Sequence, residues 1–237
     1  EIYTLSLHDA LPIYELEMDV ENAKLLTEGF IEFEGKPWVL KKANGFLNQC
    51  RKKSIFIYDD ELLVGCAGSK PRGGVLCADS CWSVLDNELD TISTRPFDPF
   101  YLSEEDRRSF LENVKPYWKN KSVYEMWCDL IPEELATLRD NGYVYIDRKA
   151  VRGYGETTPG WERLLALGIS GIRKEVKTRL AHLDSAVPGD LEKIYFLQSE
   201  LMACEGLVTL ANRYANLAEA MAEVRRSEER RVGKECR

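Results

Sequence analysis

The chain has 237 residues, with 40 acidic and 32 basic side chains and a formal net charge of −8 at pH 7. An acidic chain without a basic patch argues against nucleic acid as a partner. No apolar run approaches the roughly 18 residues that a membrane-spanning helix needs. The composition therefore indicates a soluble globular protein that does not act in a membrane.

The two ends of the chain, residues 1–13 and 226–237, resemble translated adapter DNA more than native protein. Residues 4–13 and 226–233 can be encoded by one sequencing-adapter oligonucleotide and by its reverse complement. The alternative is a genuine N-terminal leader and a basic C-terminal tail. Segments of this kind are left out of fold reasoning. We expect the genuine sequence at 14–225, cut at both ends, with non-native tails that make no core contacts.

The first predicted elements are two amphipathic helices. Residues 20–33 and 37–52 place apolar side chains at helical spacing. Gly35 breaks the first helix, and Pro37 suits the first turn of the second. The sequence therefore predicts a helical hairpin at this end of the chain.

Two short runs that favour β-structure follow the hairpin. They are SIFIY at 54–58 and ELLVGC at 61–66, and Asp59-Asp60 between them is a turn signal. The loop GSKPRGG at 68–74 comes next. We interpret it either as a surface connection or as a loop that places Arg72 near an anion or a partner segment.

The middle of the chain predicts short helices and one strand. Ser103 followed by Asp106 is a helix-start signature, whereas Pro96 and Pro99 prevent regular structure just before it. Asn141-Gly142 marks a turn. The expected elements are helices at 82–92, 103–118, 122–130 and 132–140 and a strand at 143–146.

A glycine-rich loop and a long helix, residues 152–174, form the stretch around which the chain is organised. The helix is expected to start at Trp161 and to bury one apolar stripe, before a last helix at 190–224 folds back on it. The expected stripe consists of Leu164, Leu165, Leu167, Ile169, Ile172, Val176, Leu180 and Leu183. The loop has the glycine outline of a phosphate loop, but Trp161 and Glu162 stand where Lys and Ser or Thr are needed, so nucleotide binding is rejected.

Six cysteines lie outside the two tails, scattered and mostly among apolar neighbours. They predict reduced thiols in a cytoplasmic protein rather than a disulfide framework. Cys77 and Cys81 are too few, without a nearby histidine, for a structural zinc site, so no metal site is expected. His182, the one histidine outside the tails, is expected to be an exposed residue late in a helix and not a general base.

Glu156 is the most informative polar residue of the glycine-rich loop. A carboxylate between glycines and threonines can accept several hydrogen bonds or act as an acid or base. The alternative is a capping role at the start of the following helix, which Thr157 or Thr158 could fill equally well, with Pro159 in the first turn. Pattern alone therefore predicts a mainly helical protein without a complete active site.

Seven stretches of the chain are more informative as an ordered set than singly. They are Thr27-Glu28, DDELLVG at 59–65, Lys70-Pro71-Arg72, ELDTI at 88–92, PYWKNKS at 116–122, LGISGIRKEV at 167–176 and EGLVTLANRYANLAEAMA at 205–222. In this order they resemble the N-terminal part of the glycyl radical enzymes, the pyruvate formate-lyase-like superfamily. The resemblance covers essentially all of 14–225, which would be a partial domain of that kind.

The resemblance implies a mainly α fold with a few short strands, the N-terminal helical portion of a larger α/β-barrel enzyme. Such enzymes are anaerobic homodimers that cleave C–C, C–O, C–N or C–S bonds of small organic substrates. Their glycyl radical is installed by an activating enzyme that uses S-adenosylmethionine and an iron–sulfur cluster, and it makes a thiyl radical on a cysteine. Neither radical-bearing motif occurs in this sequence, so no catalytic residue is expected here and this chain alone should be inert.

The resemblance also implies which residues line a substrate pocket. In the diol, glycerol and hydroxyproline dehydratases the glycine corresponding to Gly155 is followed by a histidine that contacts the substrate hydroxyl, whereas here the residue is Glu156. The candidate pocket residues are Tyr154, Glu156, Thr157, Thr158 and Arg72. A decarboxylase, a C–N, C–S or C–C lyase and a dehydratase all remain open, and a non-catalytic helical interaction module is the alternative from another class.

Overall fold

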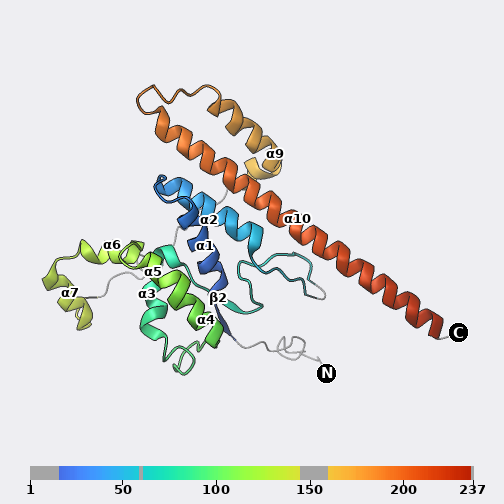
Figure 1. Cartoon of the computed structure of the whole chain (residues 1–237), viewed down its shortest axis with the longest axis horizontal. Coiled ribbons are helices and arrows are strands. Elements are labelled where there is room, and N and C mark those ends of the chain that lie inside the picture. The colour runs from blue at the N-terminus through green and yellow to red at the C-terminus, as the bar shows by residue number, and fades with distance from the viewer. Residues whose placement is uncertain (1–15, 59–60, 145–159, 236–237) are drawn as a thin grey trace, which may run out of the picture. The chain divides into compact units, whose positions relative to one another are not determined.

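The structure is a computed structural model that describes residues 16–58, 61–144 and 160–235, with side chains described as far as Arg226. It divides into two compact units. Unit 1 contains Glu1–Ala23 and Ala67–Gly153, and unit 2 contains Lys24–Cys66 and Tyr154–Arg237. The described part is mainly helical with two short strands (Figure 1), as the sequence predicts.

The predicted hairpin is confirmed as helix α1 (Glu21–Glu32), which begins in unit 1 and continues into unit 2, and helix α2 (Trp38–Lys52) of unit 2. The two helices approach closely where Gly29 faces Gly45. A Cβ placed on Gly29 would lie 2.6 Å from the Cα of Gly45 and 2.8 Å from the carbonyl oxygen of Asn44. Only glycine therefore allows the two backbones to come this near.

Two buried asparagines of α2 fasten the same contact. Asn44 donates from Nδ2 to the carbonyl oxygen of Gly29 (2.8 Å) and to the carboxylate of Glu32 (3.1 Å). One turn later, Asn48 donates from Nδ2 to the carbonyl oxygen of Leu25 (2.7 Å) and to the carboxylate of Glu28 (3.3 Å). Because a buried amide needs partners, this repeated pairing fixes the register of α1 on α2.

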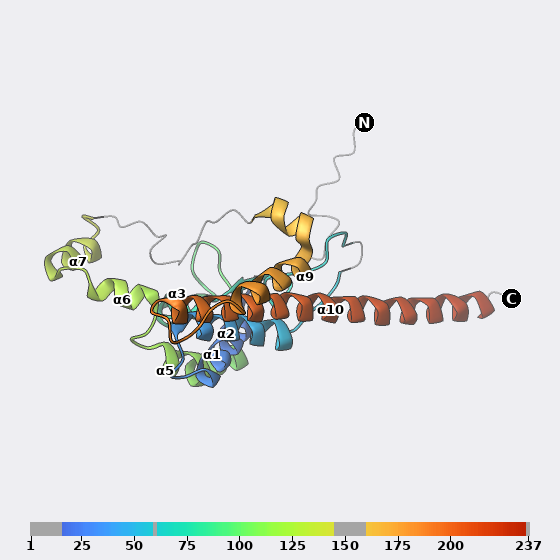
Figure 2. The same cartoon turned by 90° about the horizontal axis from the view of Figure 1, so that it is seen from above.

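Helix α10 (Asp190–Glu235) packs along α2 within unit 2 (Figures 1 and 2). Arg213 donates to the carbonyl oxygens of Cys50 (2.9 Å) and Lys53 (2.7 Å), so its guanidinium satisfies the C-terminal end of α2. Tyr214 accepts a hydrogen bond at its hydroxyl from the backbone N–H of Cys66 (3.3 Å). These two neighbours on α10 therefore hold both the end of α2 and the segment that follows it.

Helix α9 (Trp161–Leu180) lies beside α10 but is not the continuous, one-sided helix that the sequence predicts. Gly168 has φ 59° and ψ 175°, which breaks the helix after its first two turns (Figure 2). Of the predicted apolar stripe, only Val176 is buried, while Leu165 is 83% exposed. The prediction of a core-facing stripe is wrong for the described residues, because little else packs on this helix.

The two strands predicted at 54–58 and 61–66 are also wrong, since the described residues there form no ladder. Instead, Leu62 and Leu63 are 96% and 89% exposed. Of the strand predicted at 143–146, residues 143 and 144 form a bend and the others lie outside the described residues. The tail expected at 226–237 continues α10 through Glu235, and residues 1–13 lie outside the described residues.

Unit 1 holds the one sheet found among the described residues. Strand β1 (Glu17–Asp19) pairs in parallel with β2 (Gly73–Val75), with Met18 opposite Gly74. The helices of this unit are α3 (Ala78–Glu88), α4 (Glu104–Ser109), α5 (Lys115–Trp118), α6 (Val123–Asp129) and α7 (Glu133–Asp140). Phe110, Val114 and Trp118 are fully buried and pack with Trp82 and Leu85 of α3 as a core.

The helix predicted at 103–118 is present but interrupted. A π-helical turn, η1 (Phe110–Val114), separates α4 from α5. Pro116 follows this turn and has no backbone N–H, and its ring would clash with the carbonyl of Glu112 in a regular helix. A wider turn removes that clash and still points Phe110 and Val114 into the core.

Glu125 joins α6 to α3 within unit 1. Its carboxylate accepts hydrogen bonds from the indole N–H of Trp82 (2.8 Å), the hydroxyl of Ser122 (2.7 Å) and the backbone N–H of Asn120 (3.0 Å). The Ser122 hydroxyl in turn accepts from the backbone N–H of Glu125 (3.3 Å), and the Glu125 carboxylate accepts from the backbone N–H of Ser122 (3.2 Å), which together form a capping box. Burial acts against ionisation of Glu125, but these hydrogen bonds outweigh it and lower the pKa of the carboxyl group.

We predict that Gly29→Ala destabilises the chain, with a loss of about 2 kcal/mol from overpacking. The sign of the change in the free energy of unfolding is diagnostic, because a Gly→Ala change in an exposed helix stabilises by roughly 1 kcal/mol through helix propensity. Urea unfolding followed by circular dichroism measures the change. Asn216→Ala, at an exposed position of α10, is the matched control, and a higher midpoint for Gly29→Ala would contradict the close contact.

We predict that Glu125→Gln lowers stability near pH 7 and that this loss disappears in acid. The folded-state pKa is lowered, so the carboxylate stabilises the fold above its unfolded pKa of about 4.3 and ceases to do so as pH falls through the folded value. Urea unfolding between pH 7 and pH 3 measures the difference, with the exposed Glu112→Gln as control for loss of a charge. If the difference in unfolding free energy between the wild type and Glu125→Gln stayed constant down to pH 3, ionisation of Glu125 would not contribute to stability.

Candidate functional site

The predicted pocket residues fall into two groups. Tyr154, Glu156, Thr157 and Thr158 lie outside the described residues. Arg72 lies in the described loop 68–74 of unit 1, and a pocket that joins it to the other four stays a prediction. The geometry available for a candidate site is therefore that of the Arg72 loop and of the polar groups that hold it.

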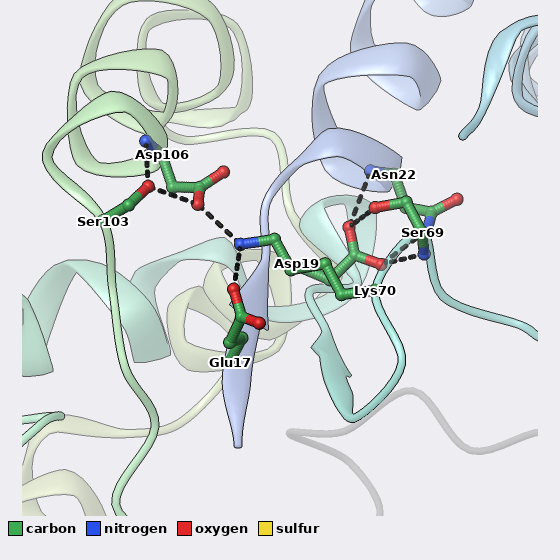
Figure 3. A network of polar contacts seen from close by, with 7 residues as sticks. All are labelled: Glu17, Asp19, Asn22, Ser69, Lys70, Ser103 and Asp106. Atoms are coloured by element: carbon green, nitrogen blue, oxygen red, sulfur yellow. Dashed lines mark hydrogen bonds and ion pairs between the residues drawn. The ribbon is translucent and has the colours of Figure 1, made fainter. Parts of the chain in front are cut away.

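The buried carboxylate of Asp19 anchors the start of this loop (Figure 3). It accepts hydrogen bonds from the backbone N–H of Ser69 (2.5 Å) and from the Ser69 hydroxyl (2.8 Å). It also accepts from Asn22, through the backbone N–H (3.3 Å) and Nδ2 (3.0 Å). One side chain thus satisfies the first turn of α1 and fixes the loop.

Lys70 anchors the loop a second time (Figure 3). Its ammonium group pairs with Asp106 (2.7 Å) and Glu17 (3.2 Å). Burial opposes the charge on Lys70, but its hydrogen bonds and attraction to Asp106 and Glu17 outweigh this and raise the pKa of its ammonium group. Asp106 is itself held by the hydroxyl of Ser103, which caps α4, so the loop is tied to both β1 and α4.

The end of the loop is fixed through its backbone. The carbonyl oxygen of Arg72 accepts from the backbone N–H of Glu17 (3.1 Å) as β2 begins its pairing with β1. A Cβ on Gly74 would lie 2.6 Å from the ring of Phe100, so the strand can lie against that ring only with glycine. The Arg72 residue itself is exposed, and it stands on a turn that is held on both sides.

This arrangement suits recognition better than proton transfer. The Asp19 carboxylate and the Lys70 ammonium are both engaged in hydrogen bonds inside the unit. Arg72 carries a guanidinium, whose planar set of donors matches carboxylate, phosphate or sulfonate groups. The structure therefore shows that Arg72 stands on an anchored turn, and its role in a pocket stays a prediction.

Sequence reasoning selected the loop but missed its anchor. The signal was available, because Asp19 lies three residues before Asn22 at the start of a predicted helix, a spacing typical of side-chain capping. Its second role, holding Ser69, depends on a contact between residues 50 positions apart that no local pattern contains.

The histidine and the cysteines that the sequence analysis discussed lie in helices or their contacts. His182 is exposed, with Nδ1 2.6 Å from the carbonyl oxygen of Thr178 near the end of α9. No disulfide joins the six described cysteines. Cys50 and Cys204 are buried, and burial raises the pKa of both thiols.

Within the described residues, no three or more His, Cys, Asp or Glu side chains gather as a metal site. No helix in the same part of the chain is long and apolar enough to cross a bilayer.

Solved structures similar to this one include a glycyl radical enzyme from Archaeoglobus fulgidus, which matches with a TM-score of 0.81 at 26% identity over 89% of this chain and 27% of that one. The structure concerned with 1,2-propanediol dehydration in Roseburia inulinivorans matches with a TM-score of 0.82 at 32% identity, over 89% of this chain and 26% of that one. The glycerol-bound, B12-independent glycerol dehydratase of Clostridium butyricum matches with a TM-score of 0.80 at 30% identity, over 88% of this chain and 26% of that one.

Sequence comparison gives the same class. The isethionate sulfite-lyase of Desulfovibrio desulfuricans is 30% identical over 214 residues, which is 87% of this chain and 26% of that protein. The family model described as pyruvate formate lyase-like matches residues 3–234. The chain therefore belongs to the pyruvate formate lyase-like family, and it spans about a quarter of the length of the curated relatives it matches.

We predict that Asp19→Asn destabilises the chain by about 2 kcal/mol, the scale of hydrogen bonds to a charged group. The amide has one acceptor oxygen in place of two, and its NH₂ group would face the donors of Ser69 and Asn22. Urea unfolding measures the loss, and Asp129→Asn at an exposed position of α6 is the control. Equal midpoints for the two variants would show that the Asp19 network does not hold the loop.

Proposed function

We propose that this chain is the N-terminal portion of a glycyl radical enzyme that cleaves a C–C, C–O, C–N or C–S bond of a small organic substrate. The observation that carries the proposal is the family match over residues 3–234, combined with relatives that are lyases and dehydratases of about four times this length. The segments 1–13 and 226–237 are adapter-derived tails in this proposal, although the family match extends into both.

The chemistry is divided between this chain and the rest of the enzyme. The glycyl radical, installed by an activating enzyme that uses S-adenosylmethionine and an iron–sulfur cluster, supplies hydrogen-atom abstraction through a cysteine thiyl. The buried cysteines Cys50 and Cys204 do not fit that thiyl role, because both are enclosed by helix contacts within unit 2. The chain alone is inert, and the complete protein is a cytoplasmic, anaerobic homodimer.

The contribution of this chain is one wall of the substrate cavity. Glu156 follows Gly155 in the sequence, next to Tyr154, Thr157 and Thr158, and Arg72 contributes a cation on an anchored turn. The carboxylate of Glu156 either binds a cationic substrate group or accepts a hydroxyl proton. Because relatives with related folds act on 1,2-propanediol, glycerol, hydroxyproline and isethionate, the substrate class stays as broad as a small hydroxylated or charged molecule.

The test uses the complete enzyme, activated without oxygen, in wild-type form and as Glu156→Gln. Electron paramagnetic resonance reports the organic radical, and substrate turnover reports the chemistry. We expect the variant to retain the radical and to lose at least about 100-fold in kcat, the usual worth of a general acid or base. If Glu156 instead binds a cationic group, KM rises more than kcat falls.

The matched control is Glu162→Gln, which removes an exposed carboxylate in the first turn of α9 and is expected to leave turnover unchanged. Unchanged kcat and KM for Glu156→Gln would remove any role for Glu156 in chemistry or binding. An activated wild-type enzyme without an organic radical would instead overturn the proposed class.

A further inference from the structure

Two cysteines of unit 1 lie one helical turn apart at the start of α3. Cys77 directly precedes the helix, and Cys81 is its fourth residue. The carbonyl oxygen of Cys77 accepts hydrogen bonds from the backbone N–H groups of Ser80 (3.1 Å) and Cys81 (3.0 Å). Because residues four apart in a helical turn share one face, the two thiols belong to the same small part of the surface.

The two thiols differ in accessibility. Cys77 is the one exposed residue among the six described cysteines, whereas Cys81 is half-buried, and no disulfide joins them. Thiols that respond to oxidants are typically accessible to solvent and have a second thiol close by, which resolves the first oxidation product. Cys77 and Cys81 combine these two properties within five residues of sequence.

The backbone allows the two thiols to meet. Residues four apart in a helical turn have Cα atoms about 6 Å apart, inside the range of roughly 4.4–6.8 Å that disulfides span. Their Cβ atoms lie about 5–6 Å apart in a regular helix, which is wider than a disulfide prefers. Both cysteines leave regular helical geometry, however, with φ −88° and ψ 85° at Cys77 and φ −152° and ψ 47° at Cys81. The turn is therefore not held at the wider spacing.

We infer that Cys77 and Cys81 form a reversible disulfide when the protein meets a small-molecule disulfide such as oxidised glutathione. The Cys77 thiolate attacks one sulfur of the oxidant, whose S–S bond breaks and releases one thiol. Cys81 then gives up its proton and attacks the Cys77 sulfur, which releases the second thiol. Two protein thiols are oxidised and one small-molecule disulfide is reduced. No step uses the glycyl radical, so the inference is independent of the proposed reaction.

The bond would lie directly before the core of unit 1. Trp82 follows Cys81, is 4% exposed and donates from its indole N–H to Glu125. A cross-link between residues 77 and 81 fixes the turn that leads into this side chain. Oxidation thereby couples the state of the two thiols to the start of α3. A disulfide closed from a wide spacing is readily reduced, which suits a transient modification rather than a structural staple.

The test treats the complete protein, without activation, with a mixture of oxidised and reduced glutathione. Remaining thiols are alkylated, and the protein is digested with trypsin. The peptide 73–107 contains Cys77 and Cys81 and no other cysteine. Mass spectrometry separates its reduced form, its glutathione adduct and its internal disulfide. Cys81→Ser removes the second thiol, and Cys128→Ser, which removes another half-buried thiol of unit 1, is the matched control.

We expect the wild type and Cys128→Ser to form the internal disulfide. Cys81→Ser should carry at least about 10-fold more glutathione on Cys77 than the wild type, because a thiol held nearby acts at an effective concentration in the millimolar range and displaces the adduct. Equal adducts in the wild type and Cys81→Ser would overturn the inference. A wild-type peptide that stays reduced in the native protein, or a disulfide that joins Cys77 to a second chain, would overturn it as well, and neither result depends on a variant.

Discussion

The close contact of α1 with α2 is the constraint on which the rest of unit 2 depends. Gly29 and Gly45 let the two backbones touch, and the amides of Asn44 and Asn48 set the register by bonding to carbonyls of α1. Hydrophobic burial alone would leave the helices free to slide. Because α2 is fixed in this way, its C-terminal end offers carbonyls at a defined place for Arg213, and α10 is positioned through that contact.

Much of the helical part of this fold is predictable from periodicity and breakers, as α1, α2, α6 and α10 illustrate. The wrong predictions share one physical cause, because strands depend on contacts between residues that are distant in the sequence. Strand β2 begins Gly73-Gly74, which has no strand propensity, and it is ordered by pairing with residues more than 50 positions earlier. The run at 61–66 has strand composition but forms no ladder with the described residues, so composition alone predicted structure that needs a partner.

Of the candidate site, only the loop around Arg72 lies among the described residues. Composition identifies the loop around Arg72 and the glycine-rich loop around Glu156, because glycine, proline and charge mark functional connections. It does not reveal that Asp19 and Lys70 hold the Arg72 loop, since both contacts span many residues. The role proposed for Glu156 depends on resemblance to a family, because a carboxylate after a glycine is by itself as consistent with a helix cap.

The break at Gly168 has a consequence for evolution of this enzyme. Its φ of 59° and ψ of 175° belong to a region that is open essentially to glycine alone. The direction of the first two turns of α9 is therefore set by the backbone of one residue that has no side chain. Those turns carry the chain out of the glycine-rich loop, so any side chain at position 168 would re-aim the loop's point of attachment. Selection for a new substrate can thus act on a hinge as well as on the residues that meet the ligand.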